Sequence, residues 1–299
     1  MSSKKIDLTN LEKIYWPDEK ITKGDLINYY ESIAPIILPY LKNRPLSLKR
    51  NPNGIRDEGF YQKDAGNIAP SWMKTADFHS ESSDKIVHYL VCNDKPALLF
   101  IANLGCIEMN PWNSTALKPD YPDYLAIDID PSDKNSFSDV IEVALVTKEV
   151  LDAIKITAFC KTSGASGLHV YIPCNKKFSY DTVRDFAKLI AIAVNEKLPQ
   201  LTTLERSLSK RKKNQVYIDY LQNSRGQTLA SAYSARPKPG ATVSAPLEWK
   251  EVKLDLHPSQ FTIYNIKKRV SKKGDLFAGV LGKGADIKKS IRTIEKSKQ

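Results

Sequence analysis

The chain alternates between two hydrophobic periods. In three segments apolar residues recur at helical spacing, which predicts amphipathic helices beginning near residue 23 and spanning 138–154 and 181–198. Between them, short apolar runs bounded by turn residues predict strands at 44–50, 98–101, 124–130, 156–159, 169–172 and 216–221. Strands and helices alternate without an internal repeat, so we predict an α/β (α+β) fold.

The first helix carries its own start signal. Thr22 is a suitable N-cap, and Asp25 follows three residues later, where the two can cap the helix reciprocally. Lys23 at this helix start could meet a phosphate, because the free backbone N–H groups of a first turn already favour an anion. A solvated lysine is the other interpretation.

The predicted strand 124–130 ends in two carboxylates, Asp128 and Asp130, and is closed by Pro131. Residues two apart on a strand share a face, so both carboxylates point to one side. Close carboxylates repel unless a divalent cation lies between them, and hard oxygen ligands suit Mg²⁺ or Mn²⁺, ions that serve phosphoryl and nucleotidyl transfer. Without further support, a solvated acidic turn is the simpler explanation.

Residues 161–171 predict a tight hairpin loop between two strands. Gly164 and Gly167 give the loop a bare backbone, which a phosphate can approach closely. A strand rather than a helix follows, so the loop is neither a P-loop nor a dinucleotide-binding fingerprint. An ordinary glycine-rich hairpin, with His169 packed in its strand, is the structural alternative.

A third acid, Asp219, lies inside the apolar run 215–221. An ionised side chain in such a strand must be paired, bind a metal or reach a solvent edge. Further along, Arg236 supplies a planar bidentate donor suited to a triphosphate, although a surface arginine is the default interpretation.

Three motifs occur in order along the chain: Asp128 with Asp130, Ser163-Gly164 through His169, and Asp219 with Gln222-Asn223-Ser224. Together they resemble the polymerase domain of bacterial multifunctional DNA ligase D, a branch of the archaeo-eukaryotic primase superfamily used in non-homologous end joining. The resemblance extends from Leu8 to about Leu281. It implies a primase-polymerase-like two-layer core with mainly antiparallel sheets flanked by helices.

The same resemblance implies the site residues. Two divalent ions, Mn²⁺ or Mg²⁺, would be held by the catalytic residues Asp128, Asp130 and Asp219. The incoming NTP or dNTP would contact Lys49, Ser163, Gly164, Ser166, His169, Gln222 and Arg236. The DNA end, including its 5′-phosphate, would contact Asn10, Lys13, Lys23, Phe60, Tyr61 and Lys63. Basic residues interleaved with aromatic ones are also what a nucleic-acid groove requires, although an aromatic pair is more often core.

The chain departs from the family pattern at three positions. Ser166 stands where the loop commonly has Lys, Asn110 where many relatives have His, and Asp64 where His is common. Asn can donate a hydrogen bond but cannot carry charge or transfer a proton. We expect these changes to affect rate and sugar or metal preference rather than the reaction class.

Composition and charge set the organisation. A chain of 299 residues with 41% hydrophobic content can bury a substantial core. We predict a single domain over 1–299, with a DNA-end-binding part at about 1–115, a catalytic core at about 116–250 and a basic segment at about 251–299.

Residues 266–299 contain eleven Lys or Arg against three Asp or Glu, which accounts for most of the net charge of +11. A basic face suits DNA, although a lysine-rich terminus can be only a solvated tail. Residues 210–213 form a second basic stretch, either a solvated helix end or part of the DNA track.

The remaining signals concern location. Four cysteines without a Cys-x-x-Cys pair, together with only four histidines, exclude zinc-finger spacing and indicate reduced thiols. No apolar signal segment follows the first five residues, and no run is long enough to span a membrane. We expect a cytoplasmic, nucleoid-associated bacterial protein that does not bind membranes.

The expected activity is template-dependent, DNA-end-directed nucleotidyl transfer. The enzyme would extend a primer 3′-hydroxyl or fill gaps with NTPs, with ribonucleotides preferred, in double-strand break repair. Its partners would be gapped or 5′-phosphorylated DNA, a Ku-like end-binding protein and a DNA ligase. A primer-independent primase and a non-catalytic DNA-end-bridging module are the alternatives. Matches at Asn10, Lys13 and Lys23 argue against the first, and the acidic triad argues against the second.

Overall fold

The computed structural model describes residues 4, 6–80 and 84–291, which form two compact units. The first contains the described residues up to 117 with 228–245 and 259–274, and the second contains 118–227, 246–258 and the described residues from 275 onward. Both Asp128 and Asp219 belong to the second unit, whereas the part beyond residue 251 contributes to both. The first three residues, Lys5 and the basic residues Arg292, Lys296 and Lys298 lie outside the described residues.

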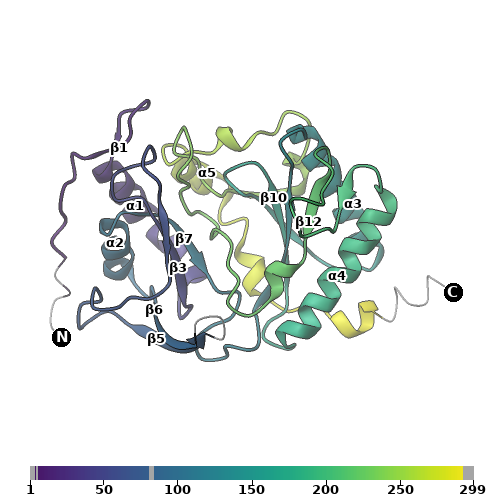
Figure 1. Cartoon of the computed structure of the whole chain (residues 1–299), viewed down its shortest axis with the longest axis horizontal. Helices are drawn as coiled ribbons and strands as arrows, with labels where there is room; N and C mark the ends of the chain where they lie inside the picture. Colours follow the sequence, from purple (N-terminus) through teal and green to yellow (C-terminus); the bar gives the residue numbers. More distant parts are fainter. Residues whose placement is uncertain (1–3, 5, 81–83, 292–299) are drawn as a thin grey trace. The chain divides into compact units, whose positions relative to one another are not determined.

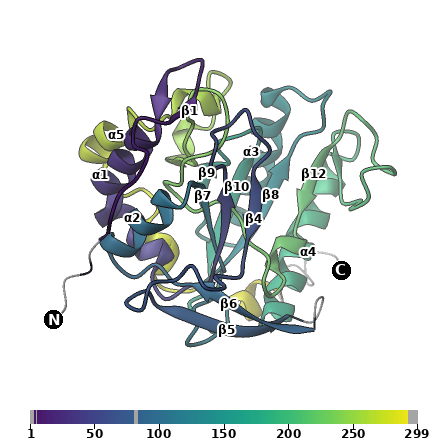
Figure 2. The same cartoon turned by 60° about the vertical axis from the view of Figure 1, so that its left-hand side comes forward.

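The first unit combines small antiparallel sheets with three helices (Figures 1 and 2). Its elements are β1 (Ile14–Trp16), β2 (Ile21–Thr22), α1 (Lys23–Leu41), β3 (Leu46–Arg50), β4 (Phe60–Gln62), β5 (Thr75–Ser80), β6 (Lys85–Leu90), α2 (Lys95–Asn103), β7 (Cys106–Pro111) and α5 (Ile266–Lys273). The strands pair in the order β4-β3-β7, while β1 pairs with β2 and β5 with β6. Helices α1 and α2 pack against each other.

Helix α1 begins where the sequence predicts. The Thr22 hydroxyl accepts a hydrogen bond from the Asp25 backbone N–H at 3.1 Å, and the Asp25 carboxylate accepts one from the Thr22 N–H at 2.8 Å. This reciprocal pair is the capping box expected from residues 22–25. Along the buried face, the Tyr29 hydroxyl donates to the Tyr233 carbonyl, which ties the helix to a segment two hundred residues later.

The predicted strand at 98–101 is wrong, because these residues lie inside α2. The Asp94 side chain caps this helix by accepting from the Ala97 N–H at 3.0 Å, and Pro96 occupies its first turn. A short apolar run does not distinguish a strand from a buried helix segment. The Asp94 cap and Pro96, both of types favoured at helix starts, explain why the segment is a helix.

The second unit is built on one six-stranded sheet in the order β11-β12-β8-β10-β9-β13 (Figures 1 and 2). Its elements are β8 (Tyr124–Asp130), α3 (Phe137–Ala153), β9 (Phe159–Thr162), β10 (Leu168–Pro173), α4 (Tyr180–Lys197), β11 (Thr202–Thr203), β12 (Val216–Asp219), the 3-10 helices η1 (Leu221–Asn223), η2 (Trp249–Glu251) and η4 (Ala278–Leu281), and β13 (Pro246–Leu247). A further 3-10 helix, η3 (Pro258–Gln260), lies where the chain passes back to the first unit. All pairings in the six-stranded sheet are antiparallel except β11 with β12.

The strand predicted at 156–159 is wrong except for its last residue. Lys155 has a left-handed φ of +57°, and the Ile156 N–H donates to the Leu151 carbonyl, so this segment ends α3 before β9 starts. The hairpin that follows is confirmed, because β9 and β10 pair antiparallel with Thr162 opposite Leu168.

The two faces of the central sheet differ in polarity. Leu125, Ile127 and Ile129 of β8 are fully buried and alternate with Asp128 and Asp130 on the opposite face. Helices α3 and α4 contact β8 and each other, so they lie on the same side of the sheet (Figure 1). The predicted α/β fold with mainly antiparallel sheets is therefore confirmed.

Two further features are the state of the cysteines and the apolar character of the helices. Cys92, Cys106, Cys160 and Cys174 are buried free thiols. Burial raises the pKa of Cys160 and of Cys174 to about 12, so both stay protonated at neutral pH. Within the described ranges, no helix combines the length and the apolar character that membrane crossing requires.

Candidate functional site

Four polar residues form a row across the central sheet. Asp219 pairs with Asp128 between β12 and β8, His169 pairs with Asp128 between β10 and β8, and Lys161 pairs with His169 between β9 and β10. Residues directly opposite one another share a face, so we call Asp219, Asp128, His169 and Lys161 the cross-strand row. Asp130 lies two residues from Asp128 on the same face. The structure therefore brings the three predicted carboxylates together.

The carboxylates of this row have defined partners. The Asp128 Oδ1 atom lies 3.3 Å from His169 Nε2. The Asp219 carboxylate accepts hydrogen bonds from the Leu221 N–H at 2.8 Å, from Gln222 Nε2 at 2.9 Å and from the Tyr217 hydroxyl at 3.2 Å. No three acidic, histidine or cysteine side chains among residues 4, 6–80 and 84–291 already converge as a metal-binding group. The oxygen donors fit a hard divalent cation.

The pKa of Asp130 depends on its burial and on its charged neighbours. Loss of hydration raises the pKa of Asp130, the Arg211 guanidinium opposes this rise, and the Asp219 carboxylate adds to it. Arg211 lies over the ring of Tyr217, with 3.6 Å from the guanidinium carbon to the ring centroid, and Tyr217 is the residue opposite Asp130. Arg211 belongs to the basic stretch at 210–213, so this stretch supplies a cation to the acidic face.

The loop between β9 and β10 is tightly folded onto the neighbouring strand. The Ser163 hydroxyl accepts hydrogen bonds from the Ala165 and Gly167 N–H groups, both at 3.0 Å. Gly164 has a φ of +74°, which favours glycine. A Cβ on Gly167 would lie 2.4 Å from the Ile129 carbonyl oxygen, so only glycine allows the loop to approach β8 this closely. Ser166 is exposed at the tip.

Two residues that sequence reasoning did not assign support this site. Asn223 is fully buried and bonds both backbone groups of Ala126, donating to the carbonyl at 2.7 Å and accepting from the N–H at 2.8 Å. Lys161 is also fully buried, beside His169. One sequence feature could have indicated a role for Lys161. It is a charged residue in an otherwise buried strand, and the short hairpin places it opposite His169.

The first unit contains a second polar cluster. Tyr61, Lys49 and Glu108 pair in register across β4, β3 and β7. Arg236 Nε donates to Glu108 Oε2 at 2.7 Å, and Lys49 Nζ lies 4.9 Å from the Tyr61 ring centroid while donating to the Gly59 carbonyl at 2.6 Å. The predicted nucleotide-binding residues therefore divide between the units. Lys49 and Arg236 belong to the first, and Ser163, Gly164, Ser166, His169 and Gln222 belong to the second.

The three residues predicted to grip a 5′-phosphate lie together at the start of α1. Asn10 has a left-handed φ of +54°, and its carbonyl accepts from the Lys13 N–H at 3.1 Å. The Lys13 carbonyl in turn accepts from the Lys23 N–H, while Lys23 Nζ donates to the Thr9 carbonyl, both at 2.8 Å. Burial and, to a smaller extent, the Lys13 charge lower the pKa of Lys23. Two cations held this close favour an anion between them.

The predicted aromatic platform lies in β4. Phe60 and Tyr61 are 47% and 60% exposed, so neither packs in the core. Consecutive strand residues point to opposite faces, and each ring has its own cation, Arg50 beside Phe60 at 5.3 Å and Lys49 beside Tyr61. Lys63 is exposed just after the strand.

Two of the residues that depart from the family pattern, Asn110 and Asp64, bond to the backbone. The Asn110 side chain is buried and donates to the Ser47 carbonyl at 3.2 Å. Asp64 Oδ1 accepts from the Gly66 N–H at 3.1 Å and the His88 N–H at 3.2 Å. Both side chains therefore stabilise local chain geometry.

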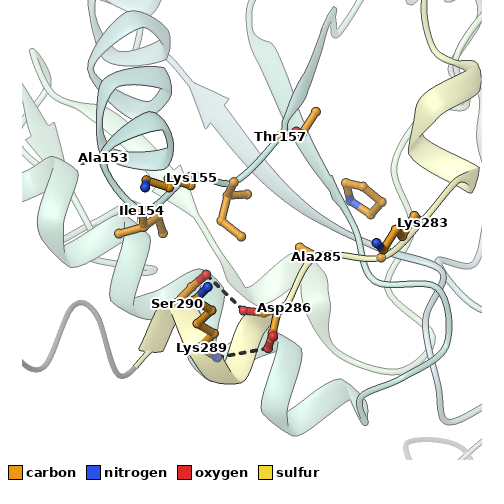
Figure 3. Close-up of a pocket in the computed structure, with 12 residues that line it drawn as sticks. Ala153, Ile154, Lys155, Thr157, Lys283, Ala285, Asp286, Lys289 and Ser290 are labelled. Atoms are coloured by element: carbon orange, nitrogen blue, oxygen red, sulfur yellow. Dashed lines mark hydrogen bonds between the residues drawn. The ribbon is translucent and has the colours of Figure 1, made fainter.

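A cavity of about 600 Å³ lies in the second unit, and none of the cross-strand row lines it (Figure 3). It is lined by Lys155 and Thr157 before β9, by Pro173 at the end of β10 remote from the Ser163 loop, and by the segment 283–290. Asp286 organises that segment by accepting from the Lys289 N–H and, through its carbonyl, from the Ser290 hydroxyl, both at 3.1 Å. None of the predicted site residues lines this cavity.

The fold, with Asp128, Asp130 and Asp219 on one face of the central sheet, is that of a primase-polymerase. Residues 22–277 match the family model of the LigD primase-polymerase domain, and the chain belongs to this family. Such a domain is a polymerase of the nucleotidyltransferase type, so the predicted class of enzyme is confirmed.

Individual relatives agree with this assignment. The chain is 36% identical over 271 residues to the bifunctional non-homologous end joining protein LigD of Bacillus subtilis and 30% identical over 283 residues to the multifunctional LigD of Mycobacterium tuberculosis H37Rv. These matches cover 90% and 92% of this chain but only 43% and 37% of the relatives. The polymerase domain of M. tuberculosis ligase D, solved in complex with DNA, has a TM-score of 0.87 at 28% identity, with 95% of this chain and all of that one covered.

Proposed function

We propose that this chain extends a primer 3′-hydroxyl at a DNA end or gap, using a template and nucleoside triphosphates. The observation that carries the proposal is the shared face of Asp128, Asp130 and Asp219, with Asp128 directly opposite Asp219. In the reaction, the primer hydroxyl attacks the α-phosphate of the incoming nucleotide and pyrophosphate leaves.

Asp128, Asp130 and Asp219 would hold two divalent cations, Mn²⁺ or Mg²⁺. Such ions neutralise phosphate oxygens and lower the pKa of a bound hydroxyl. The pKa of Asp130, raised first by loss of hydration and to a smaller extent by the Asp219 carboxylate, fits this role, because a cation stabilises a charge that its surroundings disfavour. Gln222 would set the orientation of Asp219 through their hydrogen bond.

The triphosphate tail would meet donors that already surround the acids. The Ser163 hydroxyl would bind a phosphate oxygen, and His169 presents a ring nitrogen to the face that carries the acids. Gly164 and Ser166 would add backbone contacts from the same loop. From the family resemblance we also propose Lys49 and Arg236 as nucleotide-binding residues. These contacts stabilise charge and form no covalent intermediate.

Lys13 and Lys23, with Asn10, would bind the 5′-phosphate on the far side of a gap. Phe60 and Tyr61 would stack on template or end bases, because both rings are exposed, and Lys63 would contact the backbone. This arrangement favours work at broken or gapped DNA over starting chains on bare template.

The cellular setting that follows is double-strand break repair by end joining in the bacterial cytoplasm, close to the nucleoid. A Ku-like end-binding protein and a DNA ligase would be the partners, and ribonucleotides would be preferred over deoxynucleotides. The relatives named as non-homologous end joining proteins support this setting.

Primer extension on a gapped duplex with Mn²⁺ tests the proposal. Asp128→Asn should abolish extension while DNA binding, measured by fluorescence anisotropy, survives. Asp133→Asn, an acidic residue just after the same strand, is the matched control and should extend normally. Full activity of Asp128→Asn would refute the assigned site. Extension only on primer-free template would indicate a primase, and binding without extension of any gapped substrate would indicate an end-bridging module.

A further inference from the structure

Lys161 is the least expected residue of the cross-strand row. Its side chain is completely buried, and it is among the largest fully buried side chains of the protein. Burying an ammonium is costly unless hydrogen bonds compensate the lost hydration. A lysine at such a position therefore needs an explanation in terms of what it contacts.

Lys161 has a close contact with His169. Lys161 Nζ lies 2.8 Å from His169 Nδ1 and 5.5 Å from the centroid of the Tyr171 ring. An ammonium has three donors and no acceptor, so the Nδ1 atom must accept. A neutral imidazole that accepts at Nδ1 carries its hydrogen on Nε2. Nε2 is the atom 3.3 Å from Asp128 Oδ1, on the face with the acids.

We propose that Lys161 is a positioning residue that fixes both the ring plane and the tautomer of His169. The lysine holds Nδ1 from the β9 side, and the ring then presents an Nε2–H donor to the acidic face. This inference rests on the proposed function, since a triphosphate bound at that face is the second acceptor to which the donor would turn. In this proposal Lys161 acts through His169 and not directly on the substrate.

The Tyr171 ring and the strand register together restrict the geometry of the Lys161–His169 pair. The Tyr171 ring lies beside both Lys161 and His169, with 6.4 Å between the Tyr171 and His169 ring centroids, and limits where the ammonium can go. The strand register puts Lys161 and His169 directly opposite each other. The pair is therefore fixed by the backbone rather than by flexible chain ends.

Nitrogen NMR of the histidine rings tests the proposal without any activity. The full chain is labelled with ¹⁵N-histidine, and the His169 signals are assigned by their loss in His169→Gln. We expect an unprotonated Nδ1 and a protonated Nε2 in the wild type, and a shift of both signals toward averaged values in Lys161→Met. A protonated Nδ1 in the wild type would overturn the proposal even if the variant does not fold. Unchanged ring signals in a folded Lys161→Met would overturn it as well.

Kinetics then separate positioning from simple structural support. Lys161→Met should raise the KM for the nucleotide about tenfold with a smaller change in kcat, and should have less than a twofold effect in a His169→Ala background. Equal effects in the two backgrounds would overturn the proposal. Lys161→Gln, which keeps a donor, should restore part of the loss, and no restoration at an unchanged fold would contradict it. A wild type that extends no primer would refute the proposed function alone, because the ring signals would still report the tautomer.

Discussion

Glu108 and Arg236 form a largely buried ion pair, with 2.7 Å between Arg236 Nε and Glu108 Oε2, although 128 positions separate them in the chain. Their side chains are 4% and 16% exposed. Lys49 stands opposite Glu108 in the strand register, so this carboxylate separates two cations predicted to bind the nucleotide.

Removing that carboxylate should destabilise the first unit. Glu108→Ala removes the carboxylate that pairs with the largely buried Arg236 guanidinium, and we expect the free energy of unfolding to fall by about 3 kcal/mol. Urea denaturation measures this loss. In a double-mutant cycle, adding Arg236→Ala to Glu108→Ala should cost less than in the wild type. Strictly additive effects would show that the pair does not interact in solution.

Lys23 should determine the preference for phosphorylated ends. Its Nζ atom is held by the Thr9 carbonyl beside Lys13, so we expect Lys23→Met to reduce the affinity ratio of 5′-phosphorylated to 5′-hydroxyl gaps by about tenfold, or about 1.4 kcal/mol. Anisotropy titrations at fixed salt measure the ratio. The control is Lys42→Met, an exposed lysine at the other end of α1. An equal loss in both variants would mean that only general charge matters.

The basic helix α5 should contribute salt-dependent DNA affinity. Lys268 and Lys272 are exposed and one helical turn apart, in a helix whose eight residues include five cations and no acid. Like charges at this spacing repel, so Lys268→Gln/Lys272→Gln should keep or slightly raise stability. It should also lower the slope of log affinity against log salt by about 0.9 for each DNA phosphate that the helix no longer neutralises. Lys177→Gln/Lys188→Gln in the second unit removes the same charge. A slope change shared by both pairs would contradict a specific role for α5.

His88 should titrate above its ordinary pKa. The hydrogen bond from His88 Nδ1 to Asp77 Oδ1, 2.8 Å long, and the charge of Asp77 raise the pKa of His88 above 6.5. Because the folded pKa exceeds the unfolded one, the pair stabilises the hairpin fully below pH 6.5 and loses that contribution as the pH rises through the folded value. An NMR titration measures it, and Asp77→Asn should return the pKa toward 6.5. An identical titration in the variant would exclude the pair as the cause.

The sequence predicts the elements where local chemistry agrees with the hydrophobic pattern. The box of Thr22 and Asp25 predicts the start of α1, and the alternation before Asp130 predicts β8. It does not predict α2, because the four apolar residues 98–101 fit a strand as well as a helix and only Asp94 and Pro96 decide. Strand 156–159 fails for a similar reason, since the turn at Lys155 has no sequence signal of its own.

The candidate site was likewise predicted from the sequence only in part. Asp128, Asp130 and Asp219 could be proposed from residue type and strand period alone, but their grouping depends on a register between β8 and β12 that no local pattern encodes. Lys161 and Asn223 were given no role, because the role of a buried lysine or asparagine depends on its partner, His169 for one and the Ala126 backbone for the other. Glu108 was missed likewise, since Arg236 lies far along the chain.

The interleaving of the two units constrains how the protein can assemble during synthesis. Strand β7 and Glu108 leave the ribosome early, yet Tyr233 and Arg236, which bond to α1 and β7, follow only after most of the central sheet of the second unit has been translated. The first unit must therefore wait, with part of its apolar surface uncovered, until the intervening segment 118–227 has been made. A cut after residue 117 would keep all segments of the second unit on one piece, whereas the first unit would lose 228–245 and 259–274.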